Sequence, residues 1–175
     1  MGSSKGGESG PLVGILMGSD SDLPVMGEAA KMLKKFGVPF ELEISSAHRS
    51  PERTRRYATT AIERGLKAVI VGAGGAAHLA GVIAAETTLP VIAVPLSATS
   101  LGGLDALLSS VQMPRGIPVA TMAIGAAGAV NAAIFACEII AGSDANLAGK
   151  LLEYRKELAR GVAEKSEKAK REFEG

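Results

Sequence analysis

The chain has 175 residues, of which 47% are hydrophobic, and its formal net charge is +1 at pH 7. This balance argues against a nucleic-acid-binding protein, which usually has a strongly basic face. The single cysteine excludes an intrachain disulfide, and together with only two histidines it argues against a dedicated metal site.

Residues 1–10 are polar and rich in Gly and Ser, so we expect a disordered tail rather than a signal peptide, and a cytoplasmic protein. Beyond them, short apolar runs alternate with segments of helical periodicity. We expect strands at 12–17, 38–44, 67–71, 90–95 and 119–124, and helices at 23–36, 51–64, 76–87, 101–111 (short or irregular), 125–141 and 144–172.

This alternation predicts a parallel sheet with helices on both faces and right-handed crossovers. We interpret residues 11–142 as a single α/β catalytic domain and residues 143–175 as a C-terminal helix. The run 119–140 is long enough to resemble a membrane span. It is mostly Ala and Gly, however, and it contains Glu138, whose carboxylate is costly in a bilayer. We therefore expect a buried strand and a buried helix, and no contact with a membrane.

His48 and Arg49 lie in the turn between an expected strand and an expected helix. Ser50 fits the N-cap of that helix, and Pro51 fits its first position. In open α/β sheets this edge is where ligands bind. An imidazole can move a proton near neutral pH, and a guanidinium can hold a phosphate or carboxylate. This pair therefore indicates a phosphorylated substrate.

The turn 18–22 follows the first expected strand and precedes a helix, a position that attracts phosphate to backbone N–H groups. Ser19 and Ser21 add uncharged donors. Asp22 would repel a phosphate, so we assign it to ribose hydroxyls. The alternative is that Ser21 and Asp22 serve only to cap the helix.

The turn 72–77 fits a GxGxxA variant of the dinucleotide fingerprint, but it follows the third strand and no acidic residue ends the next one. We instead expect its glycines to let the backbone approach a flat ligand. His78 is expected one helical turn in, facing the same crevice, with a purely structural histidine as the alternative. Cys137 is expected to be a buried, inert thiol. The stripe Leu147, Leu151, Tyr154, Leu158 and Val162 indicates core or subunit packing.

These three turns, together with the segment 112–119, resemble the bacterial class I PurE family of N5-carboxyaminoimidazole ribonucleotide mutases over about residues 13–140. The resemblance implies a flavodoxin-like three-layer sandwich with a central parallel five-stranded sheet, assembled as a homo-octamer. It implies transfer of a carboxylate from the exocyclic nitrogen of an aminoimidazole ribonucleotide to ring carbon C4. It also implies that no ATP, metal or organic cofactor is used.

By position, the resemblance implies that His48 is the catalytic histidine. Ser50 stands where Thr is frequent in the family, and Ala80 stands where Pro is common. The substrate-binding residues that the resemblance implies are Ser19, Ser21, Asp22, Ser46, Ala47, Arg49, Gly74, Gly75, Ala76, His78 and Leu79.

The chemistry is consistent with these roles. Loss of the N-carboxylate needs a proton delivered to nitrogen, and carboxylation at C4 needs a proton removed from carbon. One group with an ordinary pKa of about 6.5 can do both in turn. Because released carbon dioxide must be retained, we expect a closed, apolar site with walls at 73–77 and a lid or wall at 112–118.

Two alternatives remain at this point. One is a class II type carboxylase that takes aminoimidazole ribonucleotide and free carbon dioxide. The other is a flavodoxin-like binding module without chemistry. Against a flavin module, none of the three turns carries an aromatic residue; against a phospho-receiver, Asp20 and Asp22 have no matching lysine at the fifth strand.

Overall fold

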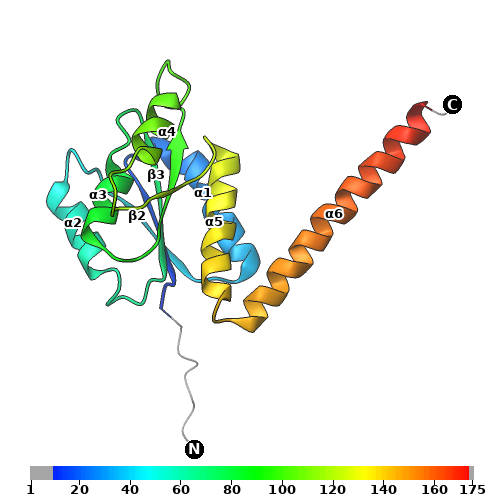
Figure 1. Cartoon of the computed structure of the whole chain (residues 1–175), viewed down its shortest axis with the longest axis horizontal. Coiled ribbons are helices and arrows are strands. Elements are labelled where there is room, and N and C mark those ends of the chain that lie inside the picture. Colours follow the sequence, from blue (N-terminus) through cyan, green and yellow to red (C-terminus); the bar gives the residue numbers. More distant parts are fainter. Residues whose placement is uncertain (1–9, 174–175) are drawn as a thin grey trace, which may run out of the picture.

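A five-stranded parallel sheet in the order β2-β1-β3-β4-β5 forms the centre of the computed structural model, which describes residues 10–173 (Figure 1). This is the flavodoxin-like strand order. The expected tail therefore lies outside the described residues, except for Gly10. The strands are β1 (Val13–Met17), β2 (Phe40–Ile44), β3 (Ala68–Gly74), β4 (Val91–Leu96) and β5 (Ala120–Thr121).

Helices cover both faces of the sheet, so the predicted three-layer α/β architecture is confirmed (Figure 1). α1 and α5 pack on one face, and α2, α3 and α4 pack on the other. The helical segments are η1 (Asp20–Asp22, a 3-10 turn), α1 (Leu23–Phe36), α2 (Pro51–Thr60), α3 (Leu79–Glu86), α4 (Leu104–Val111), α5 (Ala126–Ala141) and α6 (Ala145–Phe173).

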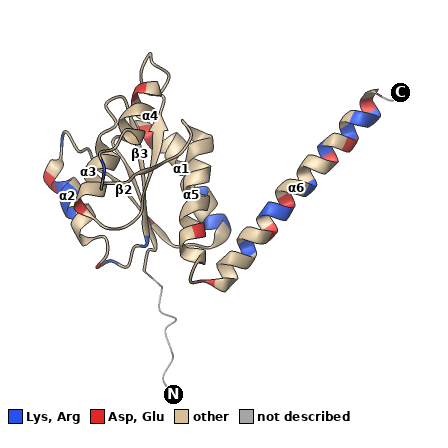
Figure 2. Ribbon diagram, viewed as in Figure 1, with Lys and Arg blue, Asp and Glu red and all other residues tan. Residues whose placement is uncertain are grey.

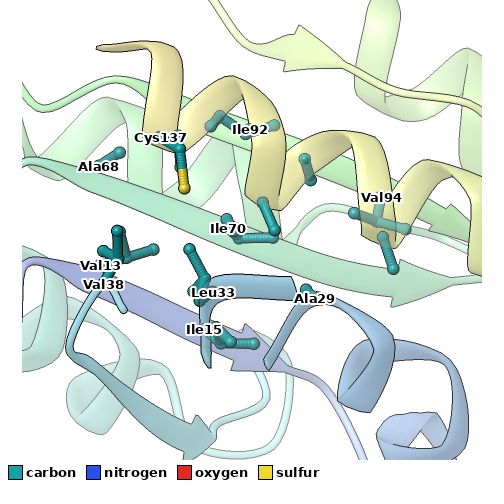
Figure 3. Close-up of a cluster of buried hydrophobic side chains, with 14 of the residues drawn as sticks. Val13, Ile15, Ala29, Leu33, Val38, Ala68, Ile70, Ile92, Val94 and Cys137 are labelled. Carbon is teal, nitrogen blue, oxygen red and sulfur yellow. The ribbon is translucent and has the colours of Figure 1, made fainter. Parts of the chain in front are cut away.

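Successive side chains of a strand point to opposite faces, and this divides the apolar residues between two cores. In β1, Ile15 packs in the α1/α5 core, whereas Leu16 packs in the core under α2 and α3. Figure 3 shows Leu33 and Ala29 of α1 above Ile15 in the first core. β1, β3 and β4 are buried along nearly their whole lengths, which explains why their sequences are continuously apolar.

α5 belongs to the run that resembled a membrane span. Its small residues bury one side of the helix against α1 and the sheet, as expected. Cys137 is buried there, and this burial raises the pKa of its thiol to about 12, as expected for an inert thiol (Figure 3). No helix within residues 10–173 has the length and apolar character needed to cross a bilayer.

Several element ends differ from the sequence prediction; α3, for example, begins only at Leu79 and α4 at Leu104. β3 continues through the predicted turn 72–74, because Gly72 and Gly74 pair with Val94 and Leu96 of β4. β5 has only two residues. The carbonyl groups of Ala93 and Pro95 both point toward β5. An N–H group at residue 95 would point the same way and extend the β4–β5 ladder, but proline has none.

α2 also ends early, at Thr60 instead of residue 64. Residues 61–65 continue as turns, and Gly65 stops them with a left-handed φ of 91°.

α6 packs on the domain only near its start. Leu147 is buried, and Tyr154 meets Phe36 edge-to-face with ring centroids 5.5 Å apart. Beyond this contact the helix continues away from the sheet, and Lys, Arg, Asp and Glu are mixed along it (Figures 1 and 2). Leu158 and Val162 of the predicted stripe are exposed in the single chain.

Candidate active site

The turns that follow β1, β2 and β3 surround a cavity of about 340 Å³ at the carboxyl edge of the sheet. The strand order places β1 between β2 and β3. The helix that follows β1 packs on one face of the sheet, whereas the helices that follow β2 and β3 pack on the other. This is the switch point where doubly wound sheets bind ligands. The cavity is lined by Gly18, Ser19, Ser21, Asp22, Ser46, Ala47, His48, Arg49, Ala73, Gly74, Ala76, Leu79 and Ala98.

Most of the residues proposed from the sequence line this cavity, but Gly75 and His78 lie outside its lining. Ala98, which follows β4, does line it and was not anticipated. A Cβ on Gly74 would lie 2.4 Å from the Ala98 Cβ, so the glycine lets the two segments touch. The signal available in the sequence was that the end of the fourth strand reaches the same edge.

The turn after β1 is a capping box. The Ser19 hydroxyl accepts a hydrogen bond from the Ser21 N–H at 3.3 Å, and Asp22 Oδ2 accepts one from the Ser19 N–H at 3.1 Å. Ser19, not Ser21, is therefore the cap. Burial raises the pKa of Asp22 against the opposing effect of the Ser19 N–H. Its other oxygen, Oδ1, has within residues 10–173 only a long 3.5 Å contact, with the Ser21 hydroxyl, which leaves it available to a ligand.

Arg49 joins two of the turns. Its Nη2 donates to the Gly18 carbonyl oxygen at 2.9 Å, so the guanidinium extends from the turn after β2 across to the turn after β1. The side chain is exposed, and a guanidinium has five N–H donors. Donors therefore remain for an anion at the mouth of the cavity.

The two histidines of the chain, 30 residues apart in sequence, meet at the rim of the cavity. His48 Nε2 lies 2.9 Å from His78 Nδ1, and the rings are perpendicular with centroids 5.0 Å apart. Because one nitrogen must donate and the other accept, the tautomers of the two rings are linked. His78 is the N-cap residue of α3, not a residue one turn inside the helix as predicted.

Gly75 turns the chain from β3 toward His78. Its φ of +60° is in the left-handed region that glycine adopts without a Cβ penalty. Ala76, which follows it, is exposed and lines the cavity at its rim.

The predicted closed site with a lid at 112–118 is wrong for the single chain. His48, Arg49, Ala76 and His78 are exposed, and no residue of 112–118 lines the cavity. Residues 116–118 instead line a separate hollow of about 600 Å³, together with residues 87–89. These segments precede β5 and β4, so that hollow lies at the amino edge of the sheet. Among residues 10–173, no three His, Cys, Asp or Glu side chains gather as a metal site requires.

An open parallel sheet with an imidazole pair and a guanidinium at its switch point is typical of an enzyme that acts on a small phosphorylated molecule. The sequence profile of the AIR carboxylase family matches residues 12–161, and the chain belongs to that family.

Several relatives are similar over most of the chain. An N5-carboxyaminoimidazole ribonucleotide mutase of Pyrococcus horikoshii is 57% identical over 90% of this chain and 88% of its own length. The Bacillus subtilis protein of the same name is 54% identical over 90% of this chain and 97% of its own. The crystal structure of Treponema denticola PurE matches with a TM-score of 0.81 and 32% identity, covering 90% of this chain and 98% of that one.

Proposed function

We propose that this chain is an N5-carboxyaminoimidazole ribonucleotide mutase of purine biosynthesis, working in the cytoplasm. The observation that carries the activity is the similarity to curated mutases over nine-tenths of the chain. The geometry supports it independently, because a proton-transferring pair and an anion-binding side chain share the rim of one cavity.

His48 is the general acid and base. As imidazolium it gives a proton to the exocyclic nitrogen while the N–carboxylate bond breaks and carbon dioxide is released. As neutral imidazole it then takes the proton from C4 when that carbon bonds to carbon dioxide. Protons and carboxylate balance over the two steps, so the net reaction is an isomerisation. A group that titrates near neutrality suits both directions.

The remaining residues hold the ribonucleotide. Arg49 binds phosphate by charge-assisted hydrogen bonds, aided by the hydroxyls of Ser19, Ser21 and Ser46. Asp22 accepts from ribose hydroxyls through Oδ1. The flat ring lies against the backbone at Gly74, which lines the cavity. The small and apolar side chains Ala47, Ala73, Ala76, Leu79 and Ala98 complete the pocket and retain carbon dioxide.

The active form is a homo-oligomer, for which we propose an octamer. One apolar face of the chain has no cover within the described residues: Leu101, Leu104, Leu108 and Val111 are between 48% and 63% exposed. Thr99 hydrogen-bonds Asp105 of α4 at 2.7 Å, which ties this face to the loop that carries Ala98. A second copy packed there would bury apolar area and narrow the open mouth. Light scattering that shows a stable monomer at micromolar concentration would contradict the assembly.

The decisive assay offers both ribonucleotides to the purified protein in isotopically labelled bicarbonate. We expect conversion of the N-carboxylated substrate without label in the product, because carbon dioxide held beside C4 is recaptured before it escapes. The alternative has a specific relative in its favour. A Saccharomyces cerevisiae phosphoribosylaminoimidazole carboxylase is 52% identical over 90% of this chain, which spans 27% of that protein. Product labelled to the level of the medium would establish the carboxylase reaction in place of the mutase.

A further inference from the structure

The side chain of Ser50 closes the turn that carries His48. The Ser46 N–H donates to Ser50 Oγ at 3.2 Å, and the Ser50 hydroxyl donates to the Ser46 carbonyl oxygen at 3.0 Å. The Ser50 N–H donates to the same carbonyl at 2.8 Å. Three hydrogen bonds therefore join the two ends of segment 47–49, and two of them pass through one hydroxyl.

We propose that Ser50 is a positioning residue whose hydroxyl clamps this turn and so holds His48 against His78. The inference rests on the proposed acid–base role of His48. Within residues 10–173, the only hydrogen bond of the His48 side chain is the one to His78, and the ring is exposed. Since the ring is exposed, its position depends on the backbone of the turn and on the contact with His78.

The clamp requires a hydroxyl. One atom must accept from an N–H and donate to a carbonyl at the same time, which Ser and Thr can do. Alanine can do neither, and a thiol does both weakly. Capping of α2 does not account for the residue, because Ser50 makes no side-chain hydrogen bond to the helix. The contribution of Ser50 to α2 comes from its backbone carbonyl, which accepts from the Thr54 N–H at 3.1 Å.

The turn stands on a rigid base. Its first residue, Ser45, donates its N–H to the Met17 carbonyl of β1 at 2.9 Å. The Ser45 hydroxyl lies 2.8 Å from that of Thr54 in α2, and both residues are buried. The ends of β2 and α2 are therefore held independently of Ser50. Loss of the Ser50 hydroxyl should release segment 47–49 and leave the fold in place, so turnover should fall more than stability does.

The experiment compares the parent chain with Ser50→Ala, Ser50→Cys, Ser50→Thr and Ser109→Ala. The Ser109 hydroxyl also donates to a main-chain carbonyl, that of Asp105 at 2.8 Å, but it lies on α4 outside the cavity. Steady-state kinetics with N5-carboxyaminoimidazole ribonucleotide give kcat and KM, calorimetry gives product affinity, and thermal unfolding gives Tm.

We expect Ser50→Ala to lower kcat roughly 10- to 100-fold, since a misplacement of about 1 Å can cost about 10²-fold. KM and product affinity should stay within about threefold of the parent, because the loss lies in the reacting geometry. Ser50→Thr should restore kcat, Ser50→Cys should fall between, and Ser109→Ala should match the parent.

Ser50→Ala with the parent kcat overturns the proposal, and so does a Ser50→Thr variant as slow as Ser50→Ala. If Ser50→Ala does not fold, parent-like kcat in Ser50→Cys overturns it instead. A parent chain without turnover contradicts the proposed function, not the clamp. In that case long-range ¹H–¹⁵N spectra decide: linked tautomers of the two imidazoles in the parent, lost in Ser50→Ala, support the clamp, and identical spectra overturn it.

Discussion

The two edges of the sheet each have a hollow, and they differ in chemistry more than in size. The hollow at the amino edge, about 600 Å³, is lined by threonines, apolar residues and Glu86. The cavity at the carboxyl edge, about 340 Å³, is lined by a histidine, an arginine and an aspartate. The parallel arrangement produces this difference, because every strand brings its following turn, with its polar residues, to the carboxyl edge. Volume alone would have favoured the amino edge over the edge that carries the histidines.

The largest loss of activity is expected from a substitution of His48 in the carboxyl-edge cavity. We expect His48→Asn to lower kcat by roughly 10²–10⁴-fold or more, because Asn keeps approximate size and hydrogen bonding but cannot titrate. Glu86→Gln at the amino-edge hollow is the control and should leave the rate unchanged, since its ion pair with Arg55 is at the surface. A His48→Asn variant with a tenth of the parent rate would assign the proton to another residue, with His78 the first to test.

Arg49 should matter for binding more than for chemistry. Arg49→Ala should weaken product binding by about 1.5–3 kcal/mol through loss of a charge-assisted contact, and by more than His48→Asn does. The parent affinity should also fall with added salt, because the side chain is exposed. Calorimetry tests both, with Arg56→Ala on the exposed side of α2 as the matched arginine control. Unchanged product affinity in Arg49→Ala would remove this residue from the phosphate site.

Gly74 tests how closely the cavity walls are packed. In Gly74→Ala the new Cβ would lie 2.4 Å from the Ala98 Cβ and 3.3 Å from the Leu96 carbonyl oxygen. We expect a loss of about 1–3 kcal/mol in the free energy of unfolding, as for other overpacked sites. Gly149→Ala on α6 has open space and should be neutral or stabilising. Urea unfolding that shows equal stability for both variants would contradict the tight contact.

The smallest expected change is in the free energy of unfolding of Asp22→Asn. Its folded-state pKa is raised, chiefly by burial, so its contribution to stability is present at low pH and is lost as pH rises through that pKa. At neutral pH the ionised carboxylate therefore destabilises the fold. We expect Asp22→Asn to raise the free energy of unfolding at pH 7 by less than about 1 kcal/mol, because the group is partly exposed.

The gain from Asp22→Asn should shrink when unfolding is measured near pH 4, and substrate binding should weaken at both pH values. A stabilisation that grows on acidification would reverse the assigned sign.

The residue pattern by itself determined the alternation of strands and helices, the parallel sheet and the three turns at its carboxyl edge. It could do so because apolar periodicity and the residues that end helices are local signals. The resemblance carried by those turns pointed to the family that the profile match identifies.

Tertiary structure decided what depends on register and on distant neighbours. Pairing with β4 made residues 72–74 a strand, although the glycines at 72, 74 and 75 favour a turn. Because Pro95 of β4 faces β5 and has no N–H group, the ladder between these strands is short. The contact between His48 and His78 joins two turns far apart in the chain, and the hydroxyl of Ser50 serves its own turn and not the helix. Local patterns cannot determine such features, because the partner of each group is chosen by which segments the folded sheet brings within hydrogen-bond distance.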